Sequence, residues 1–413
     1  MAKAQHITGI DIGSTTTRVI IGQHDHETGH LSIVGLGEAP TLGVQKGVIS
    51  DVDEAVSSLT RALDAAERMA GAPVEHAYVS INGSHIESQN SRGVIAVSRA
   101  DGEITPDDVD RVVNAAQAIS LPANREILHV LPQNYVVDGQ EHIHDPVGMT
   151  GVRLEVEAHV IEGSAPFIKN LTKVVNQAGV HIEDFVFAPL AAATAVLDKR
   201  QKELGVVLVD LGGGTTSLAI FEEKMLLHTA VLPVGASHIT NDIAIGLRTS
   251  IDVAEALKME HGTALPEEVK ANEDITIEAE GNEQESVSRK EVANIISARL
   301  EELFSFIDKE LKNIGRSGLL PAGVVLTGAG AHMPGIIEVA KKRLRLPVRI
   351  GIPHKEVVGV VGNVQDSSYA TGVGMLLWAE EQDRSSSPRA KLSVPNIGNS
   401  VQKVRDWMKT FLP

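Results

Sequence analysis

Two stretches of the sequence place a carboxylate, glycines and hydroxyls in the same order. Asp11 is followed by Gly13 and four hydroxyl residues, and Asp210 is followed by three glycines and three more hydroxyl residues. Successive glycine N–H groups can form a concave anion site, and hydroxyls add further donors. Because a carboxylate repels a bare phosphate, Asp11 and Asp210 predict a bridging Mg²⁺ held through water. An ordinary glycine-rich turn remains the alternative for either stretch taken alone.

Each stretch lies between two apolar runs rich in Val and Ile, which predicts strand, tight turn and strand. The repetition of this pattern far apart in one chain predicts two related half-domains that face each other. The residues expected to hold a ligand are the carboxylates, turn glycines, hydroxyls and one arginine: Asp11, Gly13, Ser14, Thr15, Thr16, Arg18, Asp210, Gly212, Gly213, Gly214, Thr215 and Thr216.

A third loop, in Val324–Gly335, follows another buried apolar run. It contains Gly328, Ala329 and Gly330 ahead of an expected helix start. Such a loop lets the backbone approach a nucleoside or an α-phosphate closely. The pattern GxxxxGK[ST] is absent from the sequence and this loop does not match GxGxxG. A P-loop or Rossmann nucleotide site is therefore disfavoured.

The bulk properties bound the kind of protein. A chain of 413 residues is long enough for two lobes with separate cores. It has no cysteine, which excludes disulfides and thiolate ligands and fits a reducing compartment. No secretory signal is visible and no run of about 20 apolar residues could span a bilayer. The net charge of −17 argues against nucleic-acid binding.

The C-terminal stretch has a different character. Residues 380–400 are rich in Ser, Pro, Asn and Gly and predict a flexible linker. Residues 401–413 then separate apolar and basic side chains on a helical wheel, which is typical of an interfacial anchor on an anionic membrane. The apolar face holds Val401, Val404, Trp407, Met408, Phe411 and Leu412, with Lys403, Arg405 and Lys409 beside it. A helix docked on the protein's own core is the alternative.

Residues 84–162 predict a small α+β insertion within the first lobe. Strand-like pieces at Val94–Val97, Leu128–Val137 and Val152–Val160 surround a helix at Pro106–Ile119. Thr105 is its expected N-cap, and Asp108 completes a capping box. Four histidines lie in or near this block, either as a metal site or as ordinary surface and strand residues: His129, His142, His144 and His159.

Apolar periodicity predicts the remaining helices. They are Asp51–Gly71, Ala165–Gly179, Pro189–Arg200, His238–Leu247, Val253–His261, Ser288–Leu311 and Tyr369–Leu377. Ser288 and Glu291 form an expected capping box. The small residues of Tyr369–Leu377 predict close packing between the lobes and a hinge at that junction.

The three loops in this order resemble the superfamily of actin, sugar kinases and heat-shock chaperone ATPases. The resemblance implies an α/β, two-lobed actin-like fold that binds ATP with Mg²⁺, with Asp11–Arg18 and Asp210–Ser217 as phosphate loops and Thr327–Gly335 as the adenosine loop. It implies that Thr216 faces the γ-phosphate. It also implies roles at the nucleotide for Gly235, Glu255 and Lys258. A surface ion pair is the alternative for Glu255 and Lys258.

The insertion and the basic amphipathic tail together resemble the FtsA family of bacterial cell-division proteins. This resemblance implies subdomain 1A at 1–83 and 163–200, 1C at 84–162, 2A at 201–236 and 322–379, and 2B at 237–321, followed by the linker and membrane helix. It implies filaments on the cytoplasmic face of the plasma membrane at the division septum. These filaments would tether FtsZ and recruit later division proteins.

Two further expectations come from the same resemblance. The FtsZ C-terminal peptide would dock near Arg299, with Arg289 and Lys290 as lesser candidates; a solvated basic helix face is the alternative. Ala188 stands before Pro189 where hydrolysing relatives carry an acidic residue, which implies at most slow ATP hydrolysis. A pilus- or secretion-type actin-like scaffold and a sugar kinase remain rival interpretations. A chaperone ATPase is disfavoured because only a short tail follows Leu377.

Overall fold

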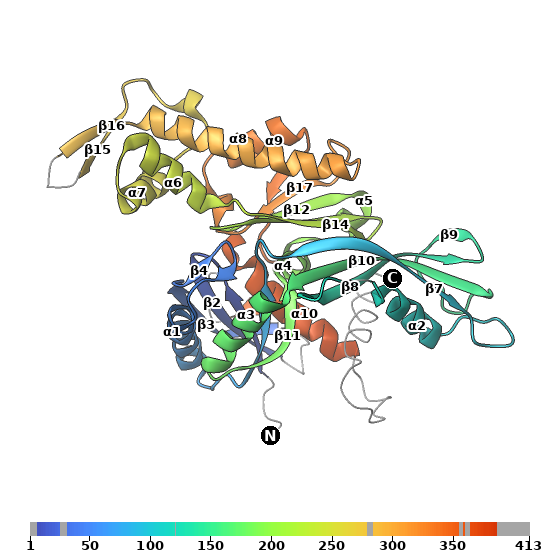
Figure 1. The fold of residues 1–413 in the computed structure, drawn as a ribbon. Helices are drawn as coiled ribbons and strands as arrows, with labels where there is room; N and C mark the ends of the chain where they lie inside the picture. The colour runs from blue at the N-terminus through green and yellow to red at the C-terminus, as the bar shows by residue number, and fades with distance from the viewer. Residues whose placement is uncertain are drawn as a thin grey trace.

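The computed structural model describes residues 6–24, 31–119, 121–278, 284–354, 358–359 and 364–385. Two central sheets lie one above the other, with helices between and around them (Figure 1). The first, in lobe I, has the order β11 (His181–Phe187), β6 (His76–Ile81), β1 (His6–Ile12), β2 (Thr16–His24), β3 (Leu31–Pro40), β19 (Val358–Gly359). The second, in lobe II, has the order β14 (Met225–Leu232), β13 (Thr216–Glu222), β12 (Val206–Leu211), β17 (Gly323–Thr327), β18 (Val348–Ile350).

The two sheets share one topology. In lobe I, β1 pairs antiparallel with β2 and parallel with β6, and β2 pairs antiparallel with β3. In lobe II, β12 pairs antiparallel with β13 and parallel with β17, and β13 pairs antiparallel with β14. The repeated order confirms the two related half-domains. Both acid-to-hydroxyl turns therefore join the same two strands of their sheets.

Two helices join the lobes: α4 (Ala188–Val196) and α10 (Ala370–Ser385). Their buried residues share one apolar core with residues of both sheets. A Cβ added at Gly374 would overlap the carbonyl oxygen of Ala191, so the small residue permits the close packing that the sequence predicts.

Helix α10 is longer than expected. It ends at Ser385, so residues 380–385 are helical and do not begin the linker. The apolar face continues past the predicted end because Trp378 and Ala379 are still buried. The rest of the predicted linker and the amphipathic segment 401–413 lie outside the described residues.

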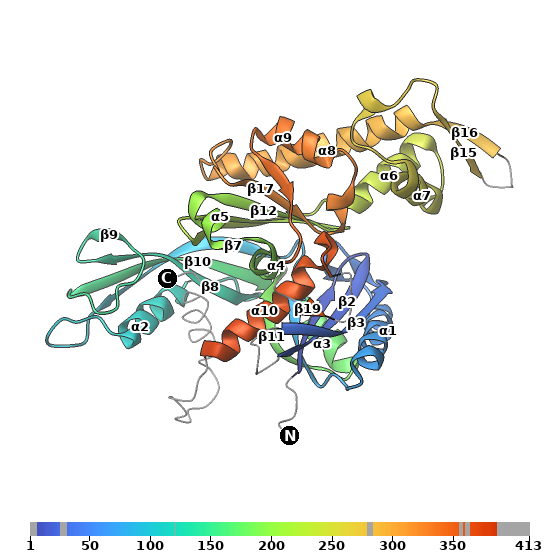
Figure 2. The same cartoon turned by 180° about the vertical axis from the view of Figure 1, so that it is seen from behind.

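The insertion is a four-stranded sheet covered by one helix, and it projects from the side of the two lobes (Figure 2). Its strands are, in spatial order, β7 (Glu87–Ala96), β10 (Arg153–Ser164), β8 (Arg125–Val137) and β9 (Gln140–Ile143). Helix α2 (Pro106–Gln117) begins with the predicted capping box of Thr105 and Asp108. The insertion has its own apolar core.

The other helices of lobe I are α1 (Val52–Ala70) and α3 (Ala165–Gln177), and the short strands β4 (Val44–Gln45) and β5 (Val48–Ile49) form a hairpin. Lobe II carries α5 (Lys199–Leu204), α6 (Ala236–Leu247), α7 (Ile251–His261), α8 (Arg289–Asn313) and α9 (Ile336–Leu344), with the hairpin β15 (Asp274–Glu278) and β16 (Gln284–Ser288). None of the described helices could span a membrane.

Two local predictions are wrong. The helix expected over Pro189–Arg200 is two helices, because Leu197 is extended and Asp198 starts α5 as an N-cap with its own capping box to Gln201. The capping box expected at Ser288 is not formed, since its side chain makes no cap hydrogen bond. Ser288 is the last residue of β16 and pairs with Asp274 of β15.

Candidate functional site

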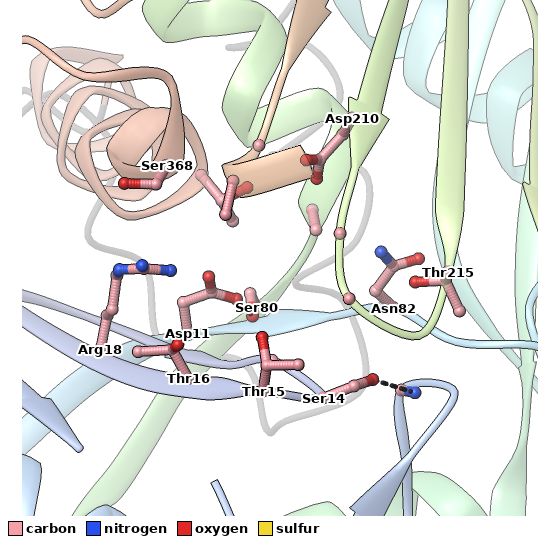
Figure 3. Close-up of a pocket in the computed structure, with 18 of the residues that line it drawn as sticks. Asp11, Ser14, Thr15, Thr16, Arg18, Ser80, Asn82, Asp210, Thr215 and Ser368 are labelled. Atoms are coloured by element: carbon pink, nitrogen blue, oxygen red, sulfur yellow. Dashed lines mark hydrogen bonds between the residues drawn. The ribbon is translucent and has the colours of Figure 1, made fainter. Parts of the chain in front are cut away.

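The three predicted loops meet in one pocket between the lobes (Figure 3). Twelve of the expected ligand residues line it: Asp11, Gly13, Ser14, Thr15, Thr16, Arg18, Asp210, Gly212, Gly213, Thr215, Gly328 and Ala329. Ala188, which the sequence singles out as the missing carboxylate, also lines the wall. Residues from both half-domains thus surround a single polar space.

The two acid-to-hydroxyl turns have the same hydrogen bond. The N–H of Gly13 donates to the carbonyl of Thr16 over 3.2 Å, and the N–H of Gly212 donates to that of Thr215 over 3.0 Å. A Cβ at Gly214 would lie 2.6 Å from Ser14 Oγ, which shows how closely the turns approach each other. Glycine is therefore required here by close approach of the two lobes.

The Asp11 and Asp210 carboxylates enter the pocket from opposite lobes (Figure 3). Burial and then the charge of Asp11 raise the pKa of Asp210 to about 7, and the Arg18 charge and a Thr371 hydrogen bond oppose the increase. Burial also raises the pKa of Asp11, opposed by the 2.6 Å hydrogen bond that Ser80 donates to it. Two carboxylates whose charges are disfavoured by burial, and in the case of Asp210 also by its neighbour Asp11, fit a divalent cation such as Mg²⁺, bound through water.

Arg18 supplies positive charge to the same wall. Its Nε donates to Glu38 Oε1 over 2.5 Å, and its guanidinium carbon lies 5.3 Å from the ring centroid of Tyr369. These two contacts fix the orientation of the side chain. Arg18 is thus a preorganised cation beside the carboxylates.

The third loop is held in place by residues that lie far along the chain. Gly328 has φ of 81°, a conformation that favours glycine, and a Cβ there would lie 2.5 Å from Asp210 Oδ1. Its N–H donates to the carbonyl of Ser367 over 3.1 Å, and Ser367 Oγ donates to the carbonyl of Gly328 over 3.0 Å. The loop is therefore pinned against the start of α10.

Sequence reasoning missed several polar residues of the pocket: Gly47, Ser80, Asn82, Ser367, Ser368 and Thr371. Ser80 and Asn82 come from the end of β6, which reaches the pocket because it pairs in parallel with β1. The N–H of Gly47, in the β4–β5 hairpin, donates to Ser14 Oγ over 2.9 Å. The sequence gives a local signal only for Ser80 and Asn82, which are polar residues at the end of the strand β6.

Other predicted residues do not line this pocket: Gly214, Thr216, Gly235, Glu255, Lys258 and Gly330. Thr216 is fully buried, and its hydroxyl donates to the carbonyl of Val234 over 2.7 Å, so Thr215 takes the pocket position instead. Glu255 and Lys258 form the i,i+3 ion pair at 2.6 Å, and Lys258 Nζ also donates to Thr240 Oγ1 over 2.9 Å.

The residues expected to bind the FtsZ peptide lie on α8. The Arg299 guanidinium donates to Asp242 from Nε over 2.5 Å and from Nη2 over 2.8 Å, and its Nη1 donates to Glu302. Arg289 pairs with Glu273 and donates to the carbonyl of His261 over 3.0 Å. Lys290 is partly exposed. The two arginines therefore face their own acidic neighbours, which reduces the positive field of this helix face.

The histidines of the insertion occupy separate places. His129 Nε2 accepts a hydrogen bond from the N–H of Phe187, and His159 is buried between Asn90 and Thr229. His142 and His144 are exposed. Among the described residues no group of three or more His, Cys, Asp or Glu side chains could hold a metal ion.

Comparison with solved structures defines the class of fold. The chain matches the "PilM-PilN type IV pilus biogenesis complex" with a TM-score of 0.67 at 14% identity, covering 91% of this chain and 98% of that one. It matches an MreB protein of Spiroplasma citri with a TM-score of 0.54 at 14% identity, covering 92% and 98%. The protein therefore has the actin-like fold, with an inserted α+β subdomain.

Sequence relatives define the family within that class. The chain is 41% identical over 373 residues to the cell division protein FtsA of Pseudomonas aeruginosa, covering 90% of this chain and 88% of the relative. It is 41% identical over 396 residues to the FtsA of Bacillus subtilis, covering 96% of this chain and 88% of the relative. It is 32% identical over 412 residues to the FtsA of Escherichia coli, covering 98% of this chain and 97% of the relative.

The family descriptions that match are "Cell division protein FtsA" at residues 207–374 and "SHS2 domain inserted in FTSA" at residues 83–162. The chain belongs to the FtsA family of cell-division proteins. The pilus-type scaffold, at 14% identity, shares the fold.

Proposed function

We propose that this cell-division protein binds ATP with Mg²⁺ between its lobes and uses the bound nucleotide to control its assembly into filaments. The single observation that carries the proposal is the pocket in which Asp11 and Asp210 face each other beside two glycine-rich turns. Glycine N–H groups and hydroxyls suit the phosphates, and the carboxylates suit the cation's water shell. The same fold in the MreB protein is described with ADP and with AMPPNP bound.

The residue Ala188 favours slow hydrolysis of the bound ATP, so that the nucleotide acts as a switch. It lines the pocket at the N-terminus of α4 and offers no carboxylate to orient water. Hydrolysis in this site would therefore be slow, and the ATP-bound state would persist while filaments assemble. ATP would then act as a ligand that favours the closed arrangement of the lobes.

The membrane and FtsZ roles rest on the sequence and the family. The apolar and basic faces of residues 401–413 suit an anionic bilayer, and several assembled chains would hold it more firmly than one. At that surface, on the cytoplasmic side of the plasma membrane, the filaments would tether FtsZ at the septum and recruit later division proteins. Because Arg299 is already paired with Asp242, peptide binding there would exchange one carboxylate partner for another.

The test uses the full chain. ATP affinity is measured by equilibrium dialysis with Mg²⁺ and with EDTA, for the unaltered protein, Asp210→Asn, and the exposed control Asp64→Asn on α1. We expect Mg²⁺-dependent ATP binding in the unaltered and control proteins and a loss of at least about tenfold in Asp210→Asn, as for a lost charge contact. Equal affinity in all three would refute the role of Asp210.

The membrane and FtsZ roles have a separate readout. Sedimentation with vesicles containing anionic lipid compares the full chain with a chain ending at residue 400, with and without ATP and an FtsZ C-terminal peptide. Loss of vesicle binding in the shortened chain supports the anchor, and unchanged binding refutes it. Peptide that stays in the supernatant while the full chain sediments refutes the tether.

A further inference from the structure

The insertion contacts both lobes, although its chain enters and leaves it through lobe I. It follows β6 and precedes α3, and it lies alongside β14 of lobe II (Figure 1). On the lobe I side, the N–H of Phe187, the last residue of β11, donates to His129 Nε2 of β8 over 3.0 Å. The insertion is therefore attached at two places that belong to different lobes.

Side chains from β7 and β8 of the insertion bind the main chain of β14. Ser88 Oγ donates to the carbonyl of Thr229 over 3.0 Å. Gln133 Nε2 donates to the carbonyls of Leu226 over 2.8 Å and Leu227 over 3.0 Å. These bonds fix the position of the insertion along β14.

A third strand, β10, contributes His159. Its Nδ1 lies 2.7 Å from Asn90 Oδ1 and its Nε2 lies 2.9 Å from Thr229 Oγ1. Because an amide oxygen only accepts, Nδ1 carries the proton and Nε2 accepts from the Thr229 hydroxyl. Burial, and then the nearby His228, lower the pKa of His159 to about 3, so the ring is neutral at physiological pH.

We call this set of contacts the insertion seam: Ser88, Gln133, His159, Thr229 and the carbonyls of Leu226 and Leu227. Gln133, His159 and Thr229 are all buried. A buried polar group that loses its partner is more costly than the hydrogen bond alone suggests. Separation of the insertion from β14 is therefore unfavourable, and the insertion should follow lobe II when the lobes move.

The seam connects to the pocket through one strand pair. Asn82 lines the pocket, and its amide and the Ser217 hydroxyl exchange two hydrogen bonds of 2.8 and 3.0 Å. Ser217 lies on β13, two residues before Ala219, which pairs with Thr229 of β14. Asn82 also directly precedes the insertion in the chain. The paired strands β13 and β14 thus connect the pocket wall to the insertion seam through hydrogen bonds.

We propose that the insertion seam couples the nucleotide pocket to the insertion, so that ATP in the pocket changes how the insertion is held between the lobes. The ATP-bound closure of the lobes moves β13 and β14 relative to lobe I, and the seam carries that movement to β7, β8 and β10. The inference rests on the proposed nucleotide site. It assigns the insertion the task of reporting the state of the pocket to a partner that binds the insertion.

The test is hydrogen exchange of the full chain with and without ATP and Mg²⁺. The seam variant is Ser88→Ala with Thr229→Val, which removes two hydroxyls and leaves the pocket unaltered. The control is Ser91→Ala, on the same strand, whose hydroxyl donates to the carbonyl of Ala116 inside the insertion. Single Ser88→Ala serves if the double variant does not fold.

In the unaltered protein and in the control, we expect ATP to change exchange rates at least about twofold in residues 125–137 and 153–164, which lie outside the phosphate turns. The seam variant should lose that response and keep ATP protection in residues 6–24 and 206–222. A response that persists in the seam variant would overturn the coupling, as would protection confined to the pocket in the unaltered protein. Absence of ATP protection in the pocket itself would overturn the proposed function and this inference with it.

Discussion

Acidification should weaken the protein through His159 in a predictable way. This side chain is 1% exposed, and burial lowers its pKa from 6.5 to about 3. The unfolded chain therefore binds a proton at a pH where the folded protein does not. Because stability rises with pH wherever the unfolded state binds more protons, His159 contributes its full stabilisation above pH 6.5 and loses it as pH falls toward 3.

The magnitude follows from the size of the shift. Each unit of pKa difference corresponds to about 1.4 kcal/mol, so His159 alone should cost about 2 kcal/mol of unfolding free energy at pH 5. The perturbation that isolates it is His159→Gln, since an amide can still donate to Asn90 and accept from Thr229 but does not titrate. Other buried groups, including His85, are present in both proteins. The difference in pH dependence therefore belongs to His159.

The assay is urea unfolding of both proteins at several values between pH 7 and 5, a range in which Asp210, whose pKa burial raises to about 7, titrates in both proteins alike. The unaltered protein should lose about 2 kcal/mol more than His159→Gln over this interval. NMR of histidine Cε1–H groups gives an independent readout, in which the signal that is absent from His159→Gln should belong to a ring that stays neutral at pH 5. Parallel stability curves, or titration of every histidine near pH 6.5, would refute the reasoning.

Three further substitutions test the fold and the site. Gly374→Val should destabilise the protein by about 1–3 kcal/mol or more in thermal unfolding, because its Cβ would overlap the carbonyl of Ala191; an unchanged midpoint would contradict this packing. Thr105→Ala should cost α2 about 1 kcal/mol by removing the capping box, seen as faster hydrogen exchange in that helix alone. Ala188→Glu should raise the rate of phosphate release at least about tenfold, and an unchanged rate would show that this position does not orient water.

The sequence predicts those parts of the pocket whose functional residues lie close together in the chain. In the turns that follow Asp11 and Asp210, the carboxylate, the glycines and the hydroxyls lie within a few residues of one another. The sequence motif therefore coincides with the site. Ser80, Asn82 and Ser367 were not predictable in this way. Each is a single polar residue that only strand pairing or the packing of α10 brings to the pocket.

Two other predictions differ from the structure because the sequence does not show the direction of a side chain or its partners from distant parts of the chain. Thr215 and Thr216 are adjacent hydroxyls, and only one can face the pocket because successive residues of a strand point to opposite faces. Pairing of Thr216 with Leu211 decides that it points into lobe II. For Arg299, the sequence shows a basic helix position but not Asp242, which lies on α6 and neutralises it.

The twofold relation between the lobes gives a reason for the place of the insertion. Strand β6 holds the same position beside β1 that β17 holds beside β12. The residues after these strands, Asn82 and Gly328, both line the pocket. In lobe II this connection forms the third glycine-rich loop, and in lobe I the insertion starts from it. The insertion thus begins in lobe I at the position that corresponds to the proposed adenosine loop of lobe II. Because Asn82 lies in the pocket wall directly before the insertion, displacement of the insertion is expected to move that wall.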